Sequence, residues 1–491
     1  MPSNGFLCRF HAALDREPTA PAVRWHDAQL SYVELYDLAE QVRKEIAGLA
    51  PGPVAVSAPK SPNGLAMLLG CWSAGRATLV PPPDLSAELL RELALRTGCR
   101  QLLRIGPDLS ITVDSVDTPP QFQNRSLPEG TLLVLSTSGS TGIPKLVPMS
   151  AAGVDAFLNW SAARFQMAPG TTVLSYAPLN FDLSLLDVWA PLSAGASTAL
   201  VDPAHAMDGR ALARFIRATR ASVIQAVPMM FRLLTAAEEA QEPFGDVREI
   251  VLTGDVAPDA LVRRILQAFP HASLSNVYGC TETNDSFLYA LDRDQATDGA
   301  PLPIGHPLPG VLTRIVDKDG TVLVGPASGE LLVSTPFQTS GYLDERLNAE
   351  RFVPDPAGES TAIFLRSGDL VDRDADGLVR LAGRADLHVK IRGVRTNIAE
   401  VEHVLAQHPE VAEAAVVALP DDQVGHLLHA VVRRGPSAAL TTLTLRQHCM
   451  RHLPRTAIPS TIRLVDDPLP TTSTGKVNRK LIEKHIGEKT A

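Results

Sequence analysis

A segment rich in glycine and hydroxyl residues could bind an anion. It reads Ser136-Thr137-Ser138-Gly139-Ser140-Thr141-Gly142-Ile143-Pro144-Lys145 and follows the apolar run at residues 132–135. Glycines allow positive φ angles, so backbone N–H groups can turn toward one ligand. The hydroxyl groups add donors and Lys145 adds a positive charge, which together would suit a triphosphate. The segment does not fit the G-x-x-x-x-G-K-[ST] pattern, which argues against a P-loop NTPase.

Two further segments carry groups that suit a nucleotide. In Tyr278-Gly279-Cys280-Thr281-Glu282 the aromatic face suits a purine, and the hard carboxylate oxygen suits Mg²⁺ that bridges phosphates. In Ser367-Gly368-Asp369 the carboxylate can accept two O–H bonds from a cis-diol. Each segment alone has a structural interpretation, as the first turn of a helix or as an Asp turn.

Two other segments place a charge where a substrate could use it. Pro470-Thr471-Thr472-Ser473-Thr474-Gly475-Lys476 sets a lysine beside a glycine and several hydroxyls, although a lone lysine is normally a solvated charge. Phe181-Asp182-Leu183-Ser184 places a carboxylate just before an apolar run, and its structural alternative is a helix cap.

Taken in chain order, these segments resemble the motifs of the adenylate-forming superfamily. That superfamily includes acyl-CoA ligases, luciferases and the adenylation domains of nonribosomal peptide synthesis. The resemblance covers nearly all 491 residues, and the chain is similar to a stand-alone amino-acid adenylation enzyme. It departs from the usual motifs at Leu146, where the superfamily has glycine, and at Asn397, where it has glutamate.

The resemblance implies ATP and Mg²⁺ as cofactors and assigns roles to individual residues. The catalytic residues would be Lys476, Thr281 and Glu282, with Glu282 also holding Mg²⁺. Asp386, in Gly383-Arg384-Ala385-Asp386, would be a hinge, and Gly393 would line a tunnel for a thiol. The implied nucleotide-binding residues are Thr137, Ser138, Gly139, Ser140, Thr141, Gly142, Lys145, Gly254, Asp255, Asn276, Tyr278, Gly279, Asp369 and Arg384.

By the same resemblance, Asp182 would pair with the α-ammonium of an amino acid. The implied substrate pocket consists of Asp182, Leu183, Leu186, Gln225, Val251, Thr253, Val277, Asp285 and Ser286. Its leucines and valines narrow the cavity, so a small amino acid such as alanine, glycine or serine fits. If Asp285 points inward, a second amine becomes possible, and a β-amino acid or a short peptide stays open.

Other functions share many of these motifs. An acyl-CoA ligase for a small carboxylic acid is the main alternative, and Asp182 argues against it. A catalytically silent homologue that binds a carrier protein is another, but Lys145, Glu282, Asp369 and Lys476 are intact. A luciferase-like oxygenase would also share the motifs. Because only eleven residues follow Lys480, we expect a separate carrier protein with a phosphopantetheine arm as acceptor; free CoA is the alternative.

The elements that must position these residues follow an α/β pattern. Short apolar runs at residues 132–135, 222–227 and 249–252 predict buried strands, and residues 208–219 and 259–269 predict helices. Ser31 and Glu34 predict a capping box that begins a helix running to about residue 48.

The resemblance implies two domains. A large N-terminal AMP-binding domain of layered α/β subdomains, with a small β subdomain from about residue 310, would span residues 1–385. A small, mobile α+β domain carrying Lys476 would span residues 386–491, with a helix at residues 397–407 and a strand at 412–418.

Composition excludes several other classes. A net charge of −9 at pH 7 argues against nonspecific nucleic-acid binding. The five cysteines form no C-x-x-C pair, which predicts free thiols rather than a zinc site or disulfides. We expect a cytoplasmic protein without membrane contact, since no signal peptide and no apolar stretch of about 20 residues is present.

Overall fold

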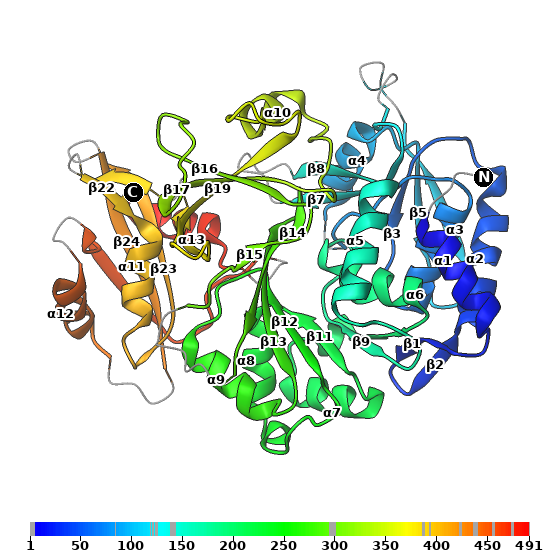
Figure 1. The fold of residues 1–491 in the computed structure, drawn as a ribbon, viewed down its shortest axis with the longest axis horizontal. Coiled ribbons are helices and arrows are strands. Elements are labelled where there is room, and N and C mark those ends of the chain that lie inside the picture. The colour runs from blue at the N-terminus through cyan, green and yellow to red at the C-terminus, as the bar shows by residue number, and fades with distance from the viewer. Residues whose placement is uncertain are drawn as a thin grey trace. The chain divides into compact units, whose positions relative to one another are not determined.

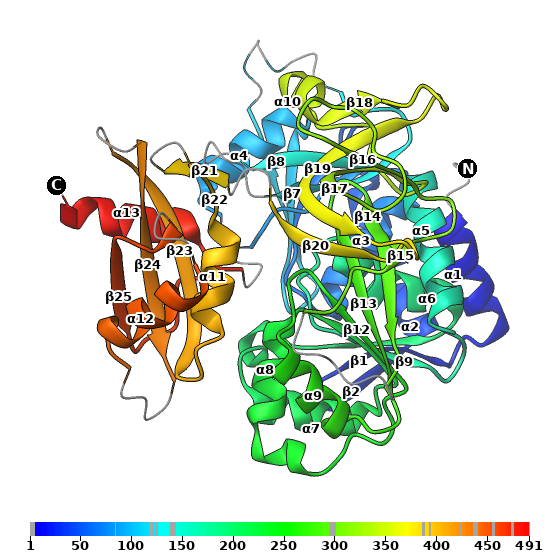
Figure 2. The ribbon, with the colours of Figure 1, turned by 60° about the vertical axis from the view of Figure 1, so that its left-hand side comes forward.

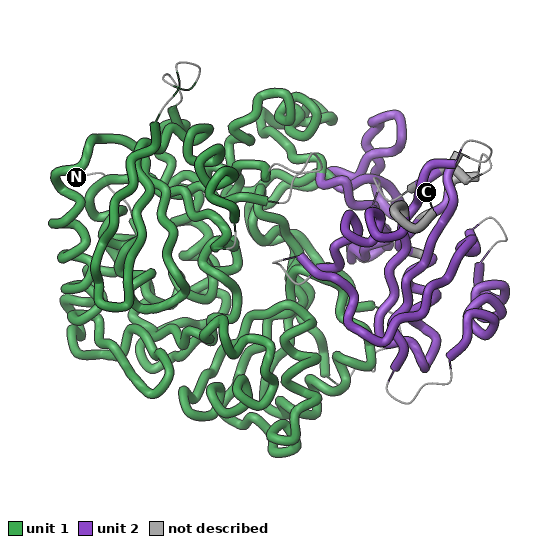
Figure 3. Tube along the Cα trace, turned by 180° about the vertical axis from the view of Figure 1, so that it is seen from behind, with its two compact units in different colours: residues 1–313, 332–366 green, residues 314–331, 367–491 purple. Residues whose placement is uncertain are grey.

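The chain forms two compact units. The computed structural model describes residues 5–83, 85–117, 119, 122, 126–137, 144–293, 301–384, 388–391, 394–421, 425–435, 440–453, 457–472 and 476–490. The first unit comprises Met1–Thr313 and Leu332–Arg366, and the second comprises Arg314–Leu331 and Ser367–Ala491 (Figure 3). The domain boundary expected between residues 385 and 386 stays a prediction.

The first unit is built around two large sheets. Among the described residues, one sheet has nine strands in the order β15-β14-β13-β12-β11-β9-β10-β1-β2 (Figure 1). Its strands from β13 to β1 run parallel to their neighbours, whereas β14, β15 and β2 are antiparallel. The bounds are β1 Pro21–Trp25, β2 Ala28–Ser31, β9 Thr172–Ser175, β10 Ser197–Leu200, β11 Val223–Ala226, β12 Glu249–Thr253, β13 Ser273–Cys280, β14 Asn284–Leu291 and β15 His306–Pro307.

The second sheet of this unit carries the predicted anion-binding segment. Within the described part of the chain it has the order β6-β5-β3-β4-β7-β8. The bounds are β3 Val54–Ser57, β4 Thr78–Leu79, β5 Gln101–Ile105, β6 Ile111–Ser115, β7 Thr131–Thr137 and β8 Lys145–Ser150. The strands predicted at residues 132–135, 222–227 and 249–252 are therefore confirmed as β7, β11 and β12.

Helices cover both faces of each sheet, which explains why most residues of the parallel strands are buried. One core contains residues of both sheets and of α1, α2, α3 and α5; α7, α8 and α9 pack on the other face of the larger sheet, and α4 on that of the smaller. The bounds are α1 Gly5–Arg16, α2 Tyr32–Glu45, α3 Pro62–Ser73, α4 Ala87–Arg96, α5 Ala151–Arg164, α6 Ala190–Ala194, α7 Gly209–Thr219, α8 Pro228–Ala236, α9 Asp259–Ala268 and α10 Glu345–Arg351.

Local capping signals read from the sequence are present. The backbone N–H of Ser31 donates to Glu34 Oε2 at 2.7 Å, and the Ser31 hydroxyl accepts from the Glu34 N–H, which completes the predicted capping box of α2. Asp208 caps α7 by accepting from the N–H of Arg210 and of Ala211. These caps satisfy N–H groups that a helix leaves unpaired at its start.

The second unit contains three helices among its described residues, packed on a three-stranded sheet. Strands β23 Val411–Asp421, β24 Gly425–Arg434 and β25 Thr461–Val465 form one sheet, with α11 Ile398–Ala406 and α12 Thr442–His452 on one face and α13 Arg479–Thr490 on the other (Figure 2). Strands β21 His388–Ile391 and β22 Val394–Asn397 form a hairpin. The helix and strand predicted at residues 397–407 and 412–418 are confirmed as α11 and β23.

A small β region precedes these elements in the chain. The bounds are β16 Leu312–Val316, β17 Ala327–Ser334, β18 Phe352–Pro354, β19 Ile363–Arg373 and β20 Val379–Arg384. Two of its turns contain Gly320 and Gly377, which adopt φ angles of +84° and +79°; glycine reaches such angles without strain.

The cysteines are free, as the sequence predicted: Cys8 is exposed, Cys280 is partly buried, and Cys71, Cys99 and Cys449 are buried. Within the described ranges, none of the helices combines the length and the hydrophobicity that crossing a bilayer would require.

Candidate active site

The β7–β8 hairpin presents the predicted anion-binding segment. The two strands are antiparallel and pair Thr137 with Lys145, at the end of the ladder next to residues 138–143. Ser138, Gly139, Ser140, Thr141 and Gly142 lie outside the described residues. Leu146 is 4% exposed, and its carbonyl accepts from the N–H of Leu343 at 3.2 Å. The leucine that replaces the usual glycine is thus a core residue that anchors Lys145.

Lys145, Tyr342 and Glu282 meet in the first unit. The Lys145 Nζ lies 5.2 Å from the centroid of the Tyr342 ring. The Tyr342 hydroxyl donates to Glu282 Oε1 at 2.5 Å, and both residues are buried. Burial, and then the negative charge of Glu282, raise the pKa of Tyr342, so its hydroxyl keeps its proton. One tyrosine therefore connects the predicted phosphate-binding lysine with the predicted metal-binding carboxylate.

Tyr342 is absent from the residues predicted above. Gly341 precedes it with a φ of +136°, and Asn348 holds its backbone by accepting from the Tyr342 N–H at 2.6 Å and donating to its carbonyl at 2.9 Å. The sequence shows a glycine directly before this tyrosine, which indicates a turn. A tyrosine that is buried needs a hydrogen-bond partner for its hydroxyl. The sequence could not name that partner, since Glu282 lies 60 positions away.

The end of β13 carries the predicted adenine-binding segment. The pairing of β13 with β14 shifts between Tyr278 and Gly279. A Cβ on Gly279 would lie 2.1 Å from the Asn284 carbonyl oxygen, so only glycine fits there. The Tyr278 ring meets the Phe287 ring edge-on, with centroids 5.9 Å apart. The bulge therefore fixes Tyr278 immediately before the turn that contains Thr281 and Glu282.

Three other predicted nucleotide-binding residues lie on β13 or directly after the neighbouring strand β12. Gly254 follows β12 with a φ of +82°. Asp255 is exposed, and its Oδ1 accepts from the N–H of Val256 at 2.8 Å. Asn276, on β13, donates from Nδ2 to the Pro303 carbonyl at 2.7 Å. The Asn276 amide nitrogen thus anchors the chain near Pro303.

The predicted substrate residues gather at the carboxyl ends of parallel strands, where open α/β sheets commonly bind ligands. The register aligns Gln225 with Val251 and Thr253 with Val277. The Gln225 amide donates to the Leu183 carbonyl at 3.0 Å, which ties the segment containing Asp182 to β11. Leu186, Val251 and Val277 belong to one hydrophobic core. The predicted pocket residues that follow β9 are therefore joined to those on the neighbouring strands β11, β12 and β13.

Asp285, at the start of β14, is an unusual member of this set. Its Oδ2 is buried and has no hydrogen-bond partner among the described residues. Burial, and then the negative charge of Asp182, raise the pKa of Asp285 to about 8. At neutral pH its carboxyl is therefore mostly protonated, while the two carboxyl groups remain close enough to interact.

A buried lysine and a buried aspartate lie behind this segment, and the sequence did not predict them as site residues. Lys60 is 5% exposed and donates from Nζ to the Ser175 carbonyl at 2.6 Å. Asp187 is fully buried within the π-helical turn Leu185–Trp189. Burial raises the pKa of Asp187 to about 7, and the charge of Lys60 opposes that rise. The turn that carries Leu186 is thus backed by an interacting pair of ionisable groups.

In the second unit, Asp369 and Arg384 form an ion pair. They lie opposite each other on β19 and β20, with Arg384 Nη1 2.8 Å from Asp369 Oδ1. The Ser367 hydroxyl donates to the Leu331 carbonyl at 2.6 Å and accepts from the Asp369 N–H at 3.0 Å. The ladder and Ser367 therefore orient the carboxylate that was predicted to bind a ribose.

Lys476 lies at the end of a closed loop of the second unit. Its carbonyl accepts from the Thr472 N–H at 2.7 Å, and Thr471 pairs with Val477. The Lys476 side chain is exposed, and its backbone is held while the side chain can reach a ligand. Asp386 and Gly393, the predicted hinge and tunnel residues, lie outside the described residues.

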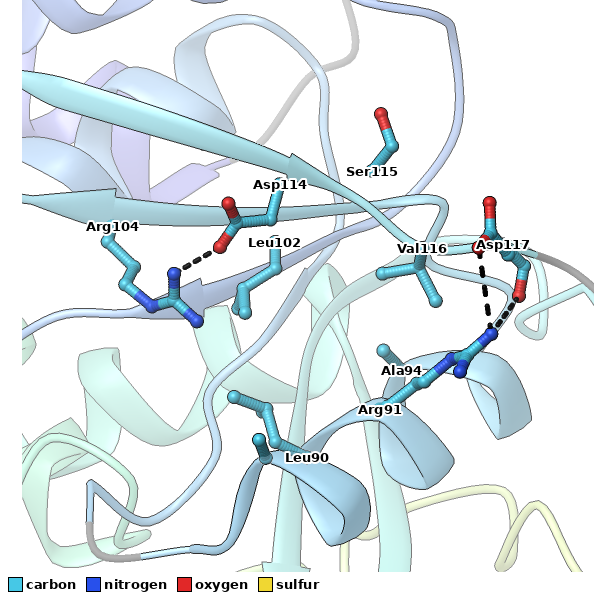
Figure 4. A pocket seen from close by; sticks show the side chains of 10 residues that line it. Leu90, Arg91, Ala94, Leu102, Arg104, Asp114, Ser115, Val116 and Asp117 are labelled. Atoms are coloured by element: carbon cyan, nitrogen blue, oxygen red, sulfur yellow. Dashed lines mark hydrogen bonds and ion pairs between the residues drawn. The ribbon is translucent and has the colours of Figure 1, made fainter.

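A cavity of about 260 Å³ lies elsewhere in the first unit, between α4 and the β5–β6 hairpin (Figure 4). Ion pairs of Arg91 with Asp117 and of Arg104 with Asp114 border it. It contains none of the predicted site residues.

Comparisons with known proteins agree with this arrangement. The chain matches the family model described as AMP-binding enzyme over residues 10–343, and the AMP-binding enzyme C-terminal domain over residues 400–476. It is 31% identical to phosphinothricin tripeptide synthetase PhsC of Streptomyces viridochromogenes over 96% of this chain, but it spans only 44% of the length of PhsC.

Two shorter proteins match over larger shares of their length. An L-proline--[L-prolyl-carrier protein] ligase of Streptomyces coelicolor is 34% identical over 80% of this chain and 75% of the ligase. The structure of Klebsiella oxytoca NpsA in complex with 3-hydroxyanthranilyl-AMSN has a TM-score of 0.81 at 25% identity, covering 98% of this chain and 99% of NpsA. Since the first family model alone covers more than half of the residues, the chain belongs to the AMP-binding enzyme family of adenylate-forming ligases.

Proposed function

We propose that this chain uses ATP to activate a small amino acid, such as alanine, glycine or serine, as an aminoacyl-AMP. It then passes the aminoacyl group to a thiol or amine on a separate carrier protein with a phosphopantetheine arm. The observation that carries the proposal is Asp182, whose negative charge helps to raise the pKa of Asp285. Leu186, Val251 and Val277 of the same predicted pocket belong to one hydrophobic core. An α-ammonium entering such a site needs a carboxylate, because an unpaired buried charge is very costly.

In the proposed first step, the substrate carboxylate attacks the α-phosphorus of ATP in line and pyrophosphate leaves. Two anions must approach each other, so catalysis consists mainly of positioning and charge neutralisation. The hairpin from Thr137 to Lys145 binds the phosphates, and Tyr278 stacks on adenine. Asp369 binds the ribose hydroxyls, and Lys476 bridges the substrate carboxylate and the α-phosphate.

Glu282 fits the proposed Mg²⁺. Among the described residues, no three His, Cys, Asp or Glu side chains come together to hold a metal. Mg²⁺ at nucleotide sites typically takes one or two carboxylates and completes its shell with phosphate and water oxygens. A single carboxylate oriented by Tyr342 meets that requirement, and the bound ion would neutralise charge on the leaving pyrophosphate.

In the proposed second step, the acceptor thiol occupies the place that Lys476 held. The small domain, residues 386–491, rotates about Asp386, which withdraws Lys476 and brings Gly393 to the thiol tunnel. Such hinge motions often gate turnover. We propose that the boundary between the two domains lies between residues 385 and 386, at this hinge.

ATP–[³²P]pyrophosphate exchange tests the first step. The panel contains the proteinogenic amino acids, several β-amino acids and the matching des-amino acids. Exchange with a small amino acid, and none with its des-amino analogue, supports both the reaction and the role of Asp182. Exchange only with des-amino acids would favour an acyl-CoA ligase, and the absence of any exchange would favour a silent homologue.

A further inference from the structure

The proposed adenylation reaction leaves one partly buried acid of the site, Asp285, without a role. Asp285 lies opposite Gly279 on the β13–β14 ladder, two residues beyond Thr283. Its Oδ2 is buried and unpartnered among the described residues. Buried polar atoms in native proteins nearly always have a hydrogen-bond partner, so such an atom calls for a water, an ion or a ligand.

Neighbouring polar side chains already use their donors within the protein. The Ser286 hydroxyl is within 3.2 Å of both Thr283 Oγ1 and the Asn284 carbonyl. The Gln225 amide donates to the Leu183 carbonyl. None of these hydrogen bonds reaches Asp285 Oδ2, which is left without a partner among the described residues.

The second acid of the site lies close enough to influence the first. The negative charge of Asp182 adds to burial in raising the pKa of Asp285. Two nearby carboxylates disfavour each other's charged form, and a cation near both reverses that effect. An ammonium group beside Asp182 alone would leave Asp285 without a partner, whereas a second ammonium group could pair with Asp285.

We propose that the substrate is a short diamino acid, such as 2,3-diaminopropionate or 2,4-diaminobutyrate, whose α-ammonium pairs with Asp182 and whose side-chain ammonium pairs with Asp285. The proposal rests on the proposed amino-acid activation and narrows its substrate class. We choose a short side chain because three residues of the predicted pocket, Leu186, Val251 and Val277, are apolar and share one packed core.

The first test is the specificity of ATP–pyrophosphate exchange. The two diamino acids are compared with serine, homoserine and 2-aminobutyrate, which have similar length but no second amine. We expect kcat/KM for a diamino acid to exceed that of its neutral analogue by about 10²-fold, the scale of one buried charge pair. Asp285→Asn should remove most of that preference, so that the ratio of kcat/KM for a diamino acid to kcat/KM for its neutral analogue falls toward one.

A matched control separates this effect from a general loss of charge. Asp246 is an exposed aspartate paired with Arg220, so Asp246→Asn should leave the preference intact. If Asp285→Asn does not fold, Asp285→Ser serves as the second variant, and the substrate panel on the unmodified protein tests the proposal without any substitution.

Proton release provides a readout besides activity. At pH 7 the free carboxyl of Asp285, with a pKa of about 8, is mostly protonated. Pairing with an ammonium would ionise it, so binding of 2,4-diaminobutyrate should release a proton, as measured by calorimetry in buffers of different ionisation enthalpy. Serine, which brings no second ammonium, should release less, and Asp285→Asn should abolish the release.

The outcomes distinguish a failure of the diamino-acid proposal from a failure of the proposed amino-acid activation. Exchange that prefers serine or alanine over both diamino acids, with no effect of Asp285→Asn on the preference, would overturn the diamino acid but keep amino-acid activation. Exchange with no amino acid at all would overturn both.

Discussion

Among single residues, Tyr342 has the most informative contacts. It donates a hydrogen bond to Glu282, and its ring lies under Lys145. A group that orients a metal-binding carboxylate usually influences metal affinity almost as much as the ligand itself. The π face of the ring also attracts the lysine charge. Tyr342 therefore contacts both a proposed phosphate-binding group and a proposed Mg²⁺-binding group.

Tyr342→Phe should weaken the response to Mg²⁺. The ring and its contact with Lys145 remain, but Glu282 loses its hydroxyl donor. We expect the Mg²⁺ concentration at half-maximal pyrophosphate exchange to rise by about tenfold. Tyr32→Phe is the control, because the Tyr32 hydroxyl donates to the Ala196 carbonyl at 2.7 Å. An equal change in both variants would assign Tyr342 a structural role only.

Lys476→Ala should abolish most adenylation without unfolding the protein. The side chain is exposed, so stability should change little. Loss of one transition-state donor should lower the exchange rate by about 10² to 10³-fold. Lys318→Ala, at a lysine that is 81% exposed, should leave the rate unchanged. Unaltered exchange in Lys476→Ala would remove this residue from the catalytic set.

At the scale of elements, the buried segment Leu185–Trp189 forms a π-helical turn in the first unit. Such turns are rare and often mark functional sites. This one carries Leu186 toward the predicted pocket and Asp187 toward Lys60, which follows β3 from the other sheet. The conformation of the pocket segment therefore depends on a charge interaction behind it as well as on apolar packing.

The Lys60–Asp187 interaction should show strong coupling in a double-mutant cycle. Lys60→Met or Asp187→Asn alone should lower the free energy of unfolding by about 3 kcal/mol, since each leaves its partner buried without the opposite charge. The double variant should lose less than the sum, with a coupling energy of about 1–3 kcal/mol in urea unfolding. Additive losses would contradict the interaction. The exposed Arg220–Asp246 pair is the reference, where about 0–1 kcal/mol is expected.

At the scale of the whole molecule, the proposed reaction draws on both compact units. Lys145, Glu282 and Asp182 belong to the first unit, whereas Asp369 and Lys476 belong to the second. In the proposal, one arrangement of the domains serves adenylation and another serves transfer, so a change at the hinge should separate the two half-reactions.

Asp386→Pro should impair transfer to the carrier thiol far more than adenylation. Proline fixes its φ near −65° and restricts the preceding residue, which limits rotation there. We expect about a 10²-fold larger loss in single-turnover thioester formation than in pyrophosphate exchange, the scale of a misplaced reactive group. Asp386→Ala, which leaves φ free, is the control. Equal losses in both half-reactions would contradict the hinge.

Much of the fold could be read from local sequence because its causes are local. Short apolar runs predicted β7, β11 and β12, and the Ser31–Glu34 capping box predicted the start of α2. Motifs in chain order were also sufficient to indicate the adenylate-forming family. Caps, turns and hydrophobic periodicity depend on residues a few positions apart, so one sequence contains the information that they need.

Only the tertiary structure decided which polar groups meet. Glu282 with Tyr342, Lys60 with Asp187, and Asp182 with Asp285 interact across long stretches of chain. The sequence named Glu282, Asp182 and Asp285 but neither their partners nor the burial that makes Asp285 unusual. Both properties depend on how strands far apart in the chain are ordered in the sheets, and that order results from packing rather than from local residue preference.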